Sequence, residues 1–138
     1  MLTNVDAAQA LADLTEISSQ VVHVAIVDES GAVLATTIGD SSRAARFVEG
    51  VTTMLDEAEE LRRSRGLPGL SQLEAATLEG SVFAVRRDGR VIAATTRPDP
   101  TVGLVFYDLK HCLRSISEGP STNGAARPRT RKRTTGAA

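Results

Sequence analysis

The sequence has few of the residues that build disulfides, aromatic ligand pockets or membrane spans. Its 138 residues include no tryptophan, one tyrosine, three phenylalanines and a single cysteine, Cys112. One cysteine cannot form an internal disulfide or a cysteine-based zinc site, and this usage is typical of the reducing cytoplasm. No run approaches 18 apolar residues and the N-terminal residues do not resemble an export signal. We therefore expect a cytoplasmic protein without a membrane span.

Motifs for nucleotide binding and catalysis are also missing. The chain has no GxxxxGK[ST] run and no GxGxxG after a predicted strand. His23 and His111 are too few for a histidine-based metal site without carboxylates, and we expect His23 to pack within a strand. His111 and Cys112 are adjacent, so on a helix they point about 100° apart and do not face each other as base and nucleophile. We expect no enzymatic activity, no cofactor and no metal.

Charge divides the chain into two parts. Five of the 16 Lys and Arg residues follow residue 118, whereas all 17 Asp and Glu residues precede residue 119. The first part has a net charge of −6 and the second of +5. From Gly119 onward alanine is the only apolar residue, a composition that cannot bury enough surface to offset chain entropy. The length and this pattern predict one domain over residues 1–118 and a disordered basic tail over residues 119–138.

The basic tail is a candidate site for anionic partners. Its charge attracts nucleic acid, anionic lipid or an acidic protein, but it has no aromatic residue for base stacking and no apolar face for membrane insertion. Any binding to nucleic acid would be weak and independent of sequence, and the tail can instead lie against the acidic body. The candidate residues are Arg127, Arg129, Arg131, Lys132 and Arg133.

Hydrophobic periodicity predicts eight elements in the order α-β-β-α-β-β-β-α. We expect helices over about residues 4–18, 41–65 and 102–117, and strands over residues 21–27, 32–38, 70–78, 81–87 and 90–96. The first strand is apolar on both faces and is expected to be central, so helices must cover both faces of the sheet. The fold class is α+β: a three-layer sandwich with a five-stranded, largely antiparallel sheet.

Caps and turns set the expected boundaries. Thr3 and Asp6 resemble a capping box for the first helix, and residues 39–42 supply cap candidates for the second. Gly66 suits the position after the end of the long helix, and Pro68 prevents its continuation. Tight loops at residues 79–80 and 88–89 connect the last three strands into a meander.

These elements and their residues resemble the roadblock family, which includes the dynein light chain roadblock and bacterial and archaeal regulators of small GTPases. The resemblance covers residues 8–116, and its motifs are specific through their joint order rather than singly. Thr101 stands where members often carry Asn, and either residue can cap a helix. The motifs are AIVD at 25–28, Gly31, VLA at 33–35, DGRVIA at 88–93 and PDPTVGLV at 98–105.

The resemblance implies a roadblock/profilin-like fold and a homodimer in which the long helices pack together and the following strands join into one sheet. It also implies a non-catalytic scaffold that binds a small Ras-like GTPase and adjusts its activity or location, with the partner supplying the bound GTP.

The residues themselves also favour a dimer. A strand at 70–78 that is paired only within the meander leaves an exposed edge, and only Glu74 discourages pairing there. Gly50 interrupts the long helix, where glycine costs about 1 kcal/mol relative to alanine, and it either permits close approach of a second helix or is simply tolerated. The candidate dimer residues are Phe47, Gly50, Met54, Leu70, Leu73 and Ala75.

Other charged residues leave alternatives open. The acidic cluster Asp56, Glu57, Glu59 and Glu60 precedes compensating arginines, so a solvated face is favoured over a binding site for a basic partner. No pattern selects an arginine finger among Arg43, Arg46, Arg86, Arg87 and Arg90. A small-ligand or signal-input sensor and a nucleic-acid-associated protein acting through its tail are the alternative functions.

Overall fold

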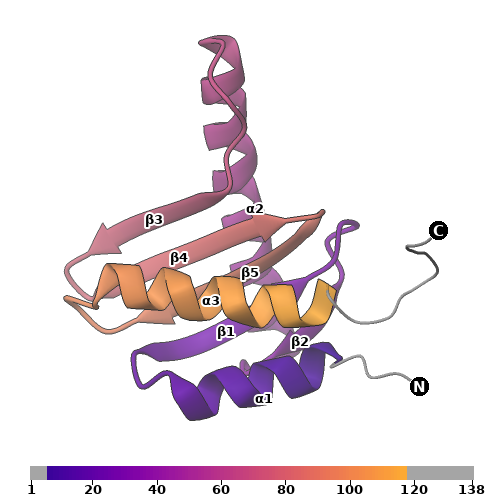
Figure 1. The fold of residues 1–138 in the computed structure, drawn as a ribbon, viewed down its shortest axis with the longest axis vertical. Helices are drawn as coiled ribbons and strands as arrows, with labels where there is room; N and C mark the ends of the chain where they lie inside the picture. The colour runs from indigo at the N-terminus through magenta and orange to yellow at the C-terminus, as the bar shows by residue number, and fades with distance from the viewer. Residues whose placement is uncertain (1–5, 118–138) are drawn as a thin grey trace, which may run out of the picture.

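The computed structural model describes residues 6–117 and arranges them in three layers around one sheet (Figure 1). The strands are antiparallel to their neighbours, in the order β2-β1-β5-β4-β3. The predicted α+β three-layer sandwich is confirmed. The elements are α1 (Ala7–Ile17), β1 (Val21–Val27), β2 (Val33–Thr36), α2 (Ser41–Ser64), β3 (Gln72–Thr77), β4 (Gly80–Arg87), β5 (Arg90–Thr96) and α3 (Val102–Ser117).

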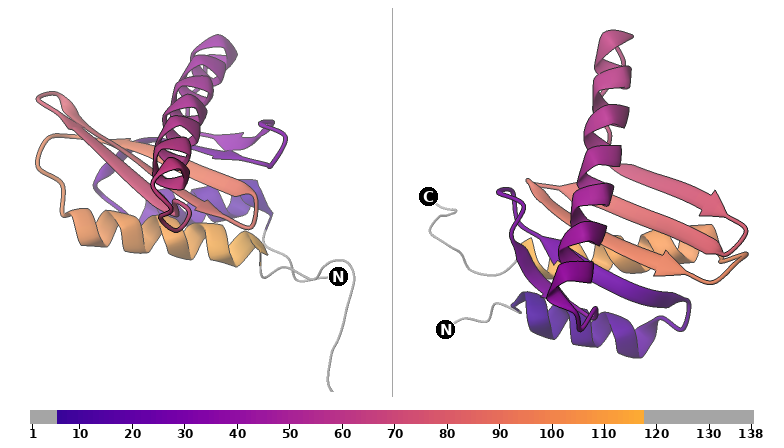
Figure 2. Two further views of the ribbon diagram at one scale, coloured as in Figure 1. Left: turned by 90° about the horizontal axis from the view of Figure 1, so that it is seen from above. Right: turned by 180° about the vertical axis from the view of Figure 1, so that it is seen from behind.

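Helices cover both faces of the sheet, as the apolar first strand requires. α1 and α3 lie side by side on one face, and α2 crosses the other (Figures 1 and 2). Val24 and Ile26 of β1 belong to the core under α1 and α3, whereas Ala25 and Val27 belong to the core under α2. Successive strand residues point to opposite faces, so a strand covered on both sides is apolar at every position.

The middle position of the sheet belongs to β5, not to β1. β1 lies between β2 and β5, so the expectation of a central first strand is wrong by one position. β2 and β3 follow each other in sequence but form the two opposite edges, because α2 carries the chain across the whole sheet. β2 is also shorter than the predicted segment 32–38.

The helix boundaries follow from their caps. Asp6, not Thr3, caps α1: its side chain accepts a hydrogen bond from the Gln9 backbone N–H at 2.9 Å, and Thr3 lies outside the described residues. Asp40 caps α2 in the same way. Gly66 adopts a φ of +69° directly after Arg65, the C-cap of α2, as predicted for the residue that follows the helix.

The two hairpin turns of the meander differ from each other. Asp88 and Gly89 have φ values of +52° and +81° and form the predicted two-residue loop. The other loop is residues 78–79 rather than 79–80, because Gly80 is already part of β4 and pairs with Thr77. Gly80 has a φ of +149°, and a Cβ there would lie 2.0 Å from the Thr96 carbonyl oxygen. Only glycine fits this position without distortion.

Among residues 6–117, no helix has the length and apolar character needed to cross a membrane. The predicted basic tail at 119–138 lies outside the described residues, so the division into a domain and a tail remains a prediction.

Candidate functional site

One edge of the sheet is open to a partner. β3 pairs with β4 on one side, and no described strand lies on its other side. Leu73 and Ala75 sit opposite Ala84 and Val82 in the register, which places them on the face that α2 crosses. Both side chains are half-buried. An unpaired strand with apolar side chains on one face is suited to pairing with a strand of another molecule.

α2 leaves part of its sheet face uncovered. Seen from behind, the helix lies across one end of the strands, and the other end extends beyond it without cover (Figure 2). At the uncovered end, a groove of about 280 Å³ is lined by Phe47 of α2, half-buried His23 and Thr95 of the sheet, and the loop residue Ile38, together with Arg43 and Arg46. His23 lies within β1, as predicted, and its half-buried side chain lines this groove.

The candidate dimer residues of α2 lie on the flank of the helix that faces the uncovered part of the sheet. Phe47, Gly50, Met54 and Leu61 follow each other at steps of three, four and seven residues, which places them in one stripe. Phe47 and Met54 are half-buried, and Gly50 has no atom within 4 Å of the position its Cβ would occupy. The stripe therefore borders open space.

The C-terminal half of α2 projects past the β3 edge (Figure 1). Leu61 on this projection is 58% exposed, and Leu67 in the following loop is 47% exposed. The projection exposes large apolar side chains beside an unpaired strand, an arrangement typical of an interaction surface.

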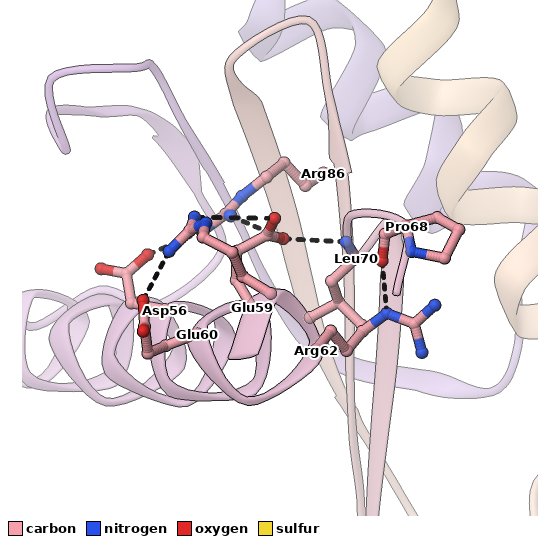
Figure 3. A network of polar contacts seen from close by, with 8 residues as sticks. Asp56, Glu59, Glu60, Arg62, Pro68, Leu70 and Arg86 are labelled. Atoms are coloured by element: carbon pink, nitrogen blue, oxygen red, sulfur yellow. Dashed lines mark hydrogen bonds and ion pairs between the residues drawn. The ribbon is translucent and has the colours of Figure 1, made fainter. Parts of the chain in front are cut away.

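A polar network joins the projecting helix to the start of β3 (Figure 3). Glu59 accepts a hydrogen bond from the Leu70 backbone N–H at 2.8 Å and lies 3.9 Å from Arg86. Arg86 also pairs with Asp56 at 3.1 Å, and Arg62 donates to the Pro68 carbonyl at 2.7 Å. The network fixes the direction in which the chain returns from α2 to the sheet edge, and it places Leu70 against the core under α2.

The acidic cluster is largely a solvated face, as predicted, since the side chains of Asp56 and Glu60 are 66% and 68% exposed and only that of Glu59, at 23%, is mostly covered. Asp56 and Glu59 are engaged by Arg86, thirty residues away from Asp56, and Glu60 pairs with Arg63. Glu59 also lies 3.9 Å from Arg63, one turn further along α2, and at this N–O distance the pair is a minor part of the arrangement. Spacing along one helix cannot reveal a partner on β4, so sequence reasoning missed it.

Replacing Arg86 with methionine is expected to lower the free energy of unfolding by about 1 kcal/mol. The substitution keeps the apolar stem and removes the cation from two carboxylates in a partly screened position. Arg87→Met is the matched control, because Arg87 is more exposed and lies 3.7 Å from Asp88. Urea titration of both variants measures the difference, and equal midpoints would show that the network does not stabilise the fold.

Cys112 does not form a reactive site. Its side chain is buried, and its thiol lies 3.4 Å from the Ala10 carbonyl oxygen. Burial, reinforced by the nearby Asp13 carboxylate, raises the pKa of the Cys112 thiol to about 12. A thiol that stays protonated at neutral pH is a poor nucleophile. In residues 6–117 no three His, Cys, Asp or Glu side chains are grouped to hold a metal ion.

Comparison with known proteins identifies the fold. No family model and no curated protein matches the sequence. The structure is similar to a Roadblock/LC7 domain from Streptomyces avermitilis, with a TM-score of 0.72 and 11% identity over 83% of this chain and 96% of that one. It is also similar to the gliding protein MglB from Thermus thermophilus, with a TM-score of 0.67 and 11% identity over 80% and 85% of the two chains.

A further similar structure is described as MglB with a tetrameric arrangement, with a TM-score of 0.69 and 11% identity over 80% of this chain and 85% of that one. At such low identities the similarity concerns the fold, and it agrees with the resemblance that the sequence motifs indicate. The chain therefore has the roadblock/LC7 fold.

Proposed function

We propose that this chain is a non-catalytic regulatory scaffold that forms a homodimer and binds a small Ras-like GTPase in the cytoplasm. The observation that carries the proposal is the unpaired β3 edge beside the projecting half of α2. The roadblock/LC7 fold supports it, as does the similarity to MglB, a gliding protein with a tetrameric form.

The projection and the uncovered sheet face complement each other. If two β3 strands pair antiparallel about a two-fold axis, each α2 continues past its own sheet edge and over the sheet of the partner. The projecting half of each α2 then packs on the uncovered end of the partner's sheet, beside the flank of the partner's α2 that carries the stripe of Phe47, Gly50 and Met54. The exposed Leu61 then becomes buried against the partner. Each subunit supplies the cover that the other lacks.

The dimer presents a surface to the GTPase that a single subunit does not have. Among residues 6–117 no three His, Cys, Asp or Glu side chains are grouped to hold a metal, and Cys112 is buried; in this proposal the nucleotide chemistry belongs to the partner. A scaffold of this kind acts by favouring one conformation of the switch loops or by positioning catalytic groups of the GTPase. Of the candidate finger arginines, Arg86 and Arg87 already pair with carboxylates, whereas no ion pair joins Arg43 or Arg46 to another described residue.

Replacing Leu61 with glutamate tests the proposal. The side chain is exposed in one subunit, so the substitution leaves the fold intact. Losing two buried leucine contacts and introducing two charges weakens self-association by about 2 kcal/mol, or about 30-fold. Sedimentation equilibrium measures the dimer. Binding of a purified Ras-like GTPase loaded with a non-hydrolysable GTP analogue measures the function.

Leu104→Glu is the matched control, because Leu104 is a helical leucine of similar exposure, 49%, on the opposite face of the sheet. We expect wild type and control to dimerise and to retain the GTPase, and Leu61→Glu to lose both properties together. A monomeric wild type contradicts the dimer. GTPase binding that is undiminished in a monomeric Leu61→Glu variant contradicts the composite surface.

A further inference from the structure

A second groove lies on the opposite side of the molecule, between the antiparallel helices α1 and α3. Its volume is about 300 Å³, and its floor is apolar, formed by the buried side chains of Ala10, Leu14 and Cys112. Its rim includes Ile17, which is 65% exposed. All of its lining residues belong to α1 and α3, which lie on the sheet face opposite α2 (Figures 1 and 2), so the groove is separate from the surface proposed for the dimer.

Acidic side chains surround this apolar floor. Asp13 and Glu16 of α1 and Asp108 of α3 line the groove, and α1 contains no lysine or arginine. Lys110 and Arg114 of α3 are not among the lining residues. The groove is therefore lined by three carboxylates and no lysine or arginine.

We propose that the basic segment 127–133 of the same chain docks in the α1–α3 groove. The segment carries Arg127, Arg129, Arg131, Lys132 and Arg133 within seven residues, and it is the densest cationic stretch of the sequence. Arginine binds carboxylates in a bidentate manner and rests its apolar stem on hydrophobic surface, so a groove with an apolar floor and an acidic rim suits it.

An aromatic surface beside the groove adds to this match. The Tyr107 and His111 rings are stacked, with centroids 6.3 Å apart and planes 11° from parallel. Tyr107 is 62% exposed, and His111 lines the groove. Arginine side chains stack on aromatic faces. The groove therefore offers a guanidinium group an ion pair and a ring face at neighbouring positions.

The segment begins close enough to reach the groove. α3 ends at Ser117, and Arg127 follows ten residues later, a length that spans up to about 33 Å when extended. The groove residues of α3 lie within the nine residues before that end, about 14 Å along the helix axis. A tether of this length holds the segment at a high effective concentration, so weak individual contacts suffice for docking.

Cleavage by trypsin in the full-length chain tests the docking directly, because trypsin cuts after Arg129, Arg131, Lys132 and Arg133 of the segment. D13N/E16Q/D108N removes the groove charges. E49Q/E79Q/D99N removes the same number of charges from exposed positions elsewhere and serves as the control. The rate of tail cleavage is followed by intact mass at low salt, with circular dichroism as the check on folding.

We expect the groove variant to be cleaved about tenfold faster than wild type and control, and this difference to disappear at about 0.5 M salt. Equal rates for the three proteins at low salt would overturn the proposal. A loss of protection on tenfold dilution would also overturn it, because the segment would then come from another copy.

A second measurement does not depend on changing the groove. Glutamine at the five cationic positions of the segment leaves residues 6–117 untouched. Backbone amide signals of Asp13, Glu16, Asp108 and His111 are expected to shift between this variant and wild type in nitrogen–proton correlation spectra. Identical spectra would refute the docking. The result does not bear on the dimer, because the groove lies on the face opposite α2.

Discussion

Replacing Gly80 with alanine is expected to lower the free energy of unfolding by about 3 kcal/mol, the largest stability effect that we predict for a single methyl group. An alanine Cβ at this position would lie 2.0 Å from the Thr96 carbonyl oxygen, which belongs to the backbone of β5 and cannot rotate away. The φ of +149° is also strained for any residue with a side chain. Relief of the clash requires β4 to move away from β5.

Gly103→Ala is the matched control for Gly80→Ala. Gly103 has no atom within 4 Å of its Cβ position and lies in the first turn of α3, where alanine is preferred. Thermal unfolding at one fixed protein concentration compares the two variants. We expect the midpoint of Gly80→Ala to fall by about 10 °C or more, and that of Gly103→Ala to stay the same or rise slightly. Equal midpoints would contradict the clash.

Replacing Gly50 with leucine is expected to have opposite effects on the subunit and on the dimer. The position is exposed and empty within 4 Å, so leucine stabilises α2 by about 0.8 kcal/mol through its higher helix propensity. In the proposed dimer the same flank receives the projecting helix of the partner, and two added leucines hold the subunits apart. The dissociation constant is expected to rise by about 100-fold, equivalent to about 3 kcal/mol.

Gly103→Leu is the control for Gly50→Leu, because Gly103 is equally unobstructed but lies on the opposite face of the sheet. Sedimentation equilibrium measures association, and thermal unfolding measures the stability of the subunit. An unchanged dissociation constant for Gly50→Leu would show that Gly50 is a tolerated helix glycine and not a contact. A less stable subunit would show instead that α2 packs differently.

The regular elements were predictable where the determining interactions are local. The left-handed glycine after the α2 cap, Gly66, and the turn at Asp88 and Gly89 were predicted to the residue, because left-handed backbone conformations favour these residue types. The α3 bounds were also predicted correctly, since its apolar stripe follows the helical period without interruption.

The features that the sequence did not predict are those that depend on contacts with residues far away along the chain. The first turn of the meander was placed one residue late because the requirement for glycine at Gly80 comes from Thr96, sixteen residues further on. The contact of Asp56 and Glu59 with Arg86 was not predicted, because Arg86 lies on a strand that is reached only after the chain has crossed the sheet. The α1–α3 groove went unpredicted, since Asp13 and Asp108 become neighbours only when two helices far apart in sequence pack together.

Composition, periodicity and turn residues by themselves determined the number, order and class of the elements, because hydrophobic spacing and backbone preferences act over a few residues. Only the tertiary structure decided which strand is central, which edge stays unpaired, and that α2 extends beyond its own sheet. These features depend on how elements that are far apart in the sequence are oriented when they pack together. The residues of a short segment do not determine that orientation.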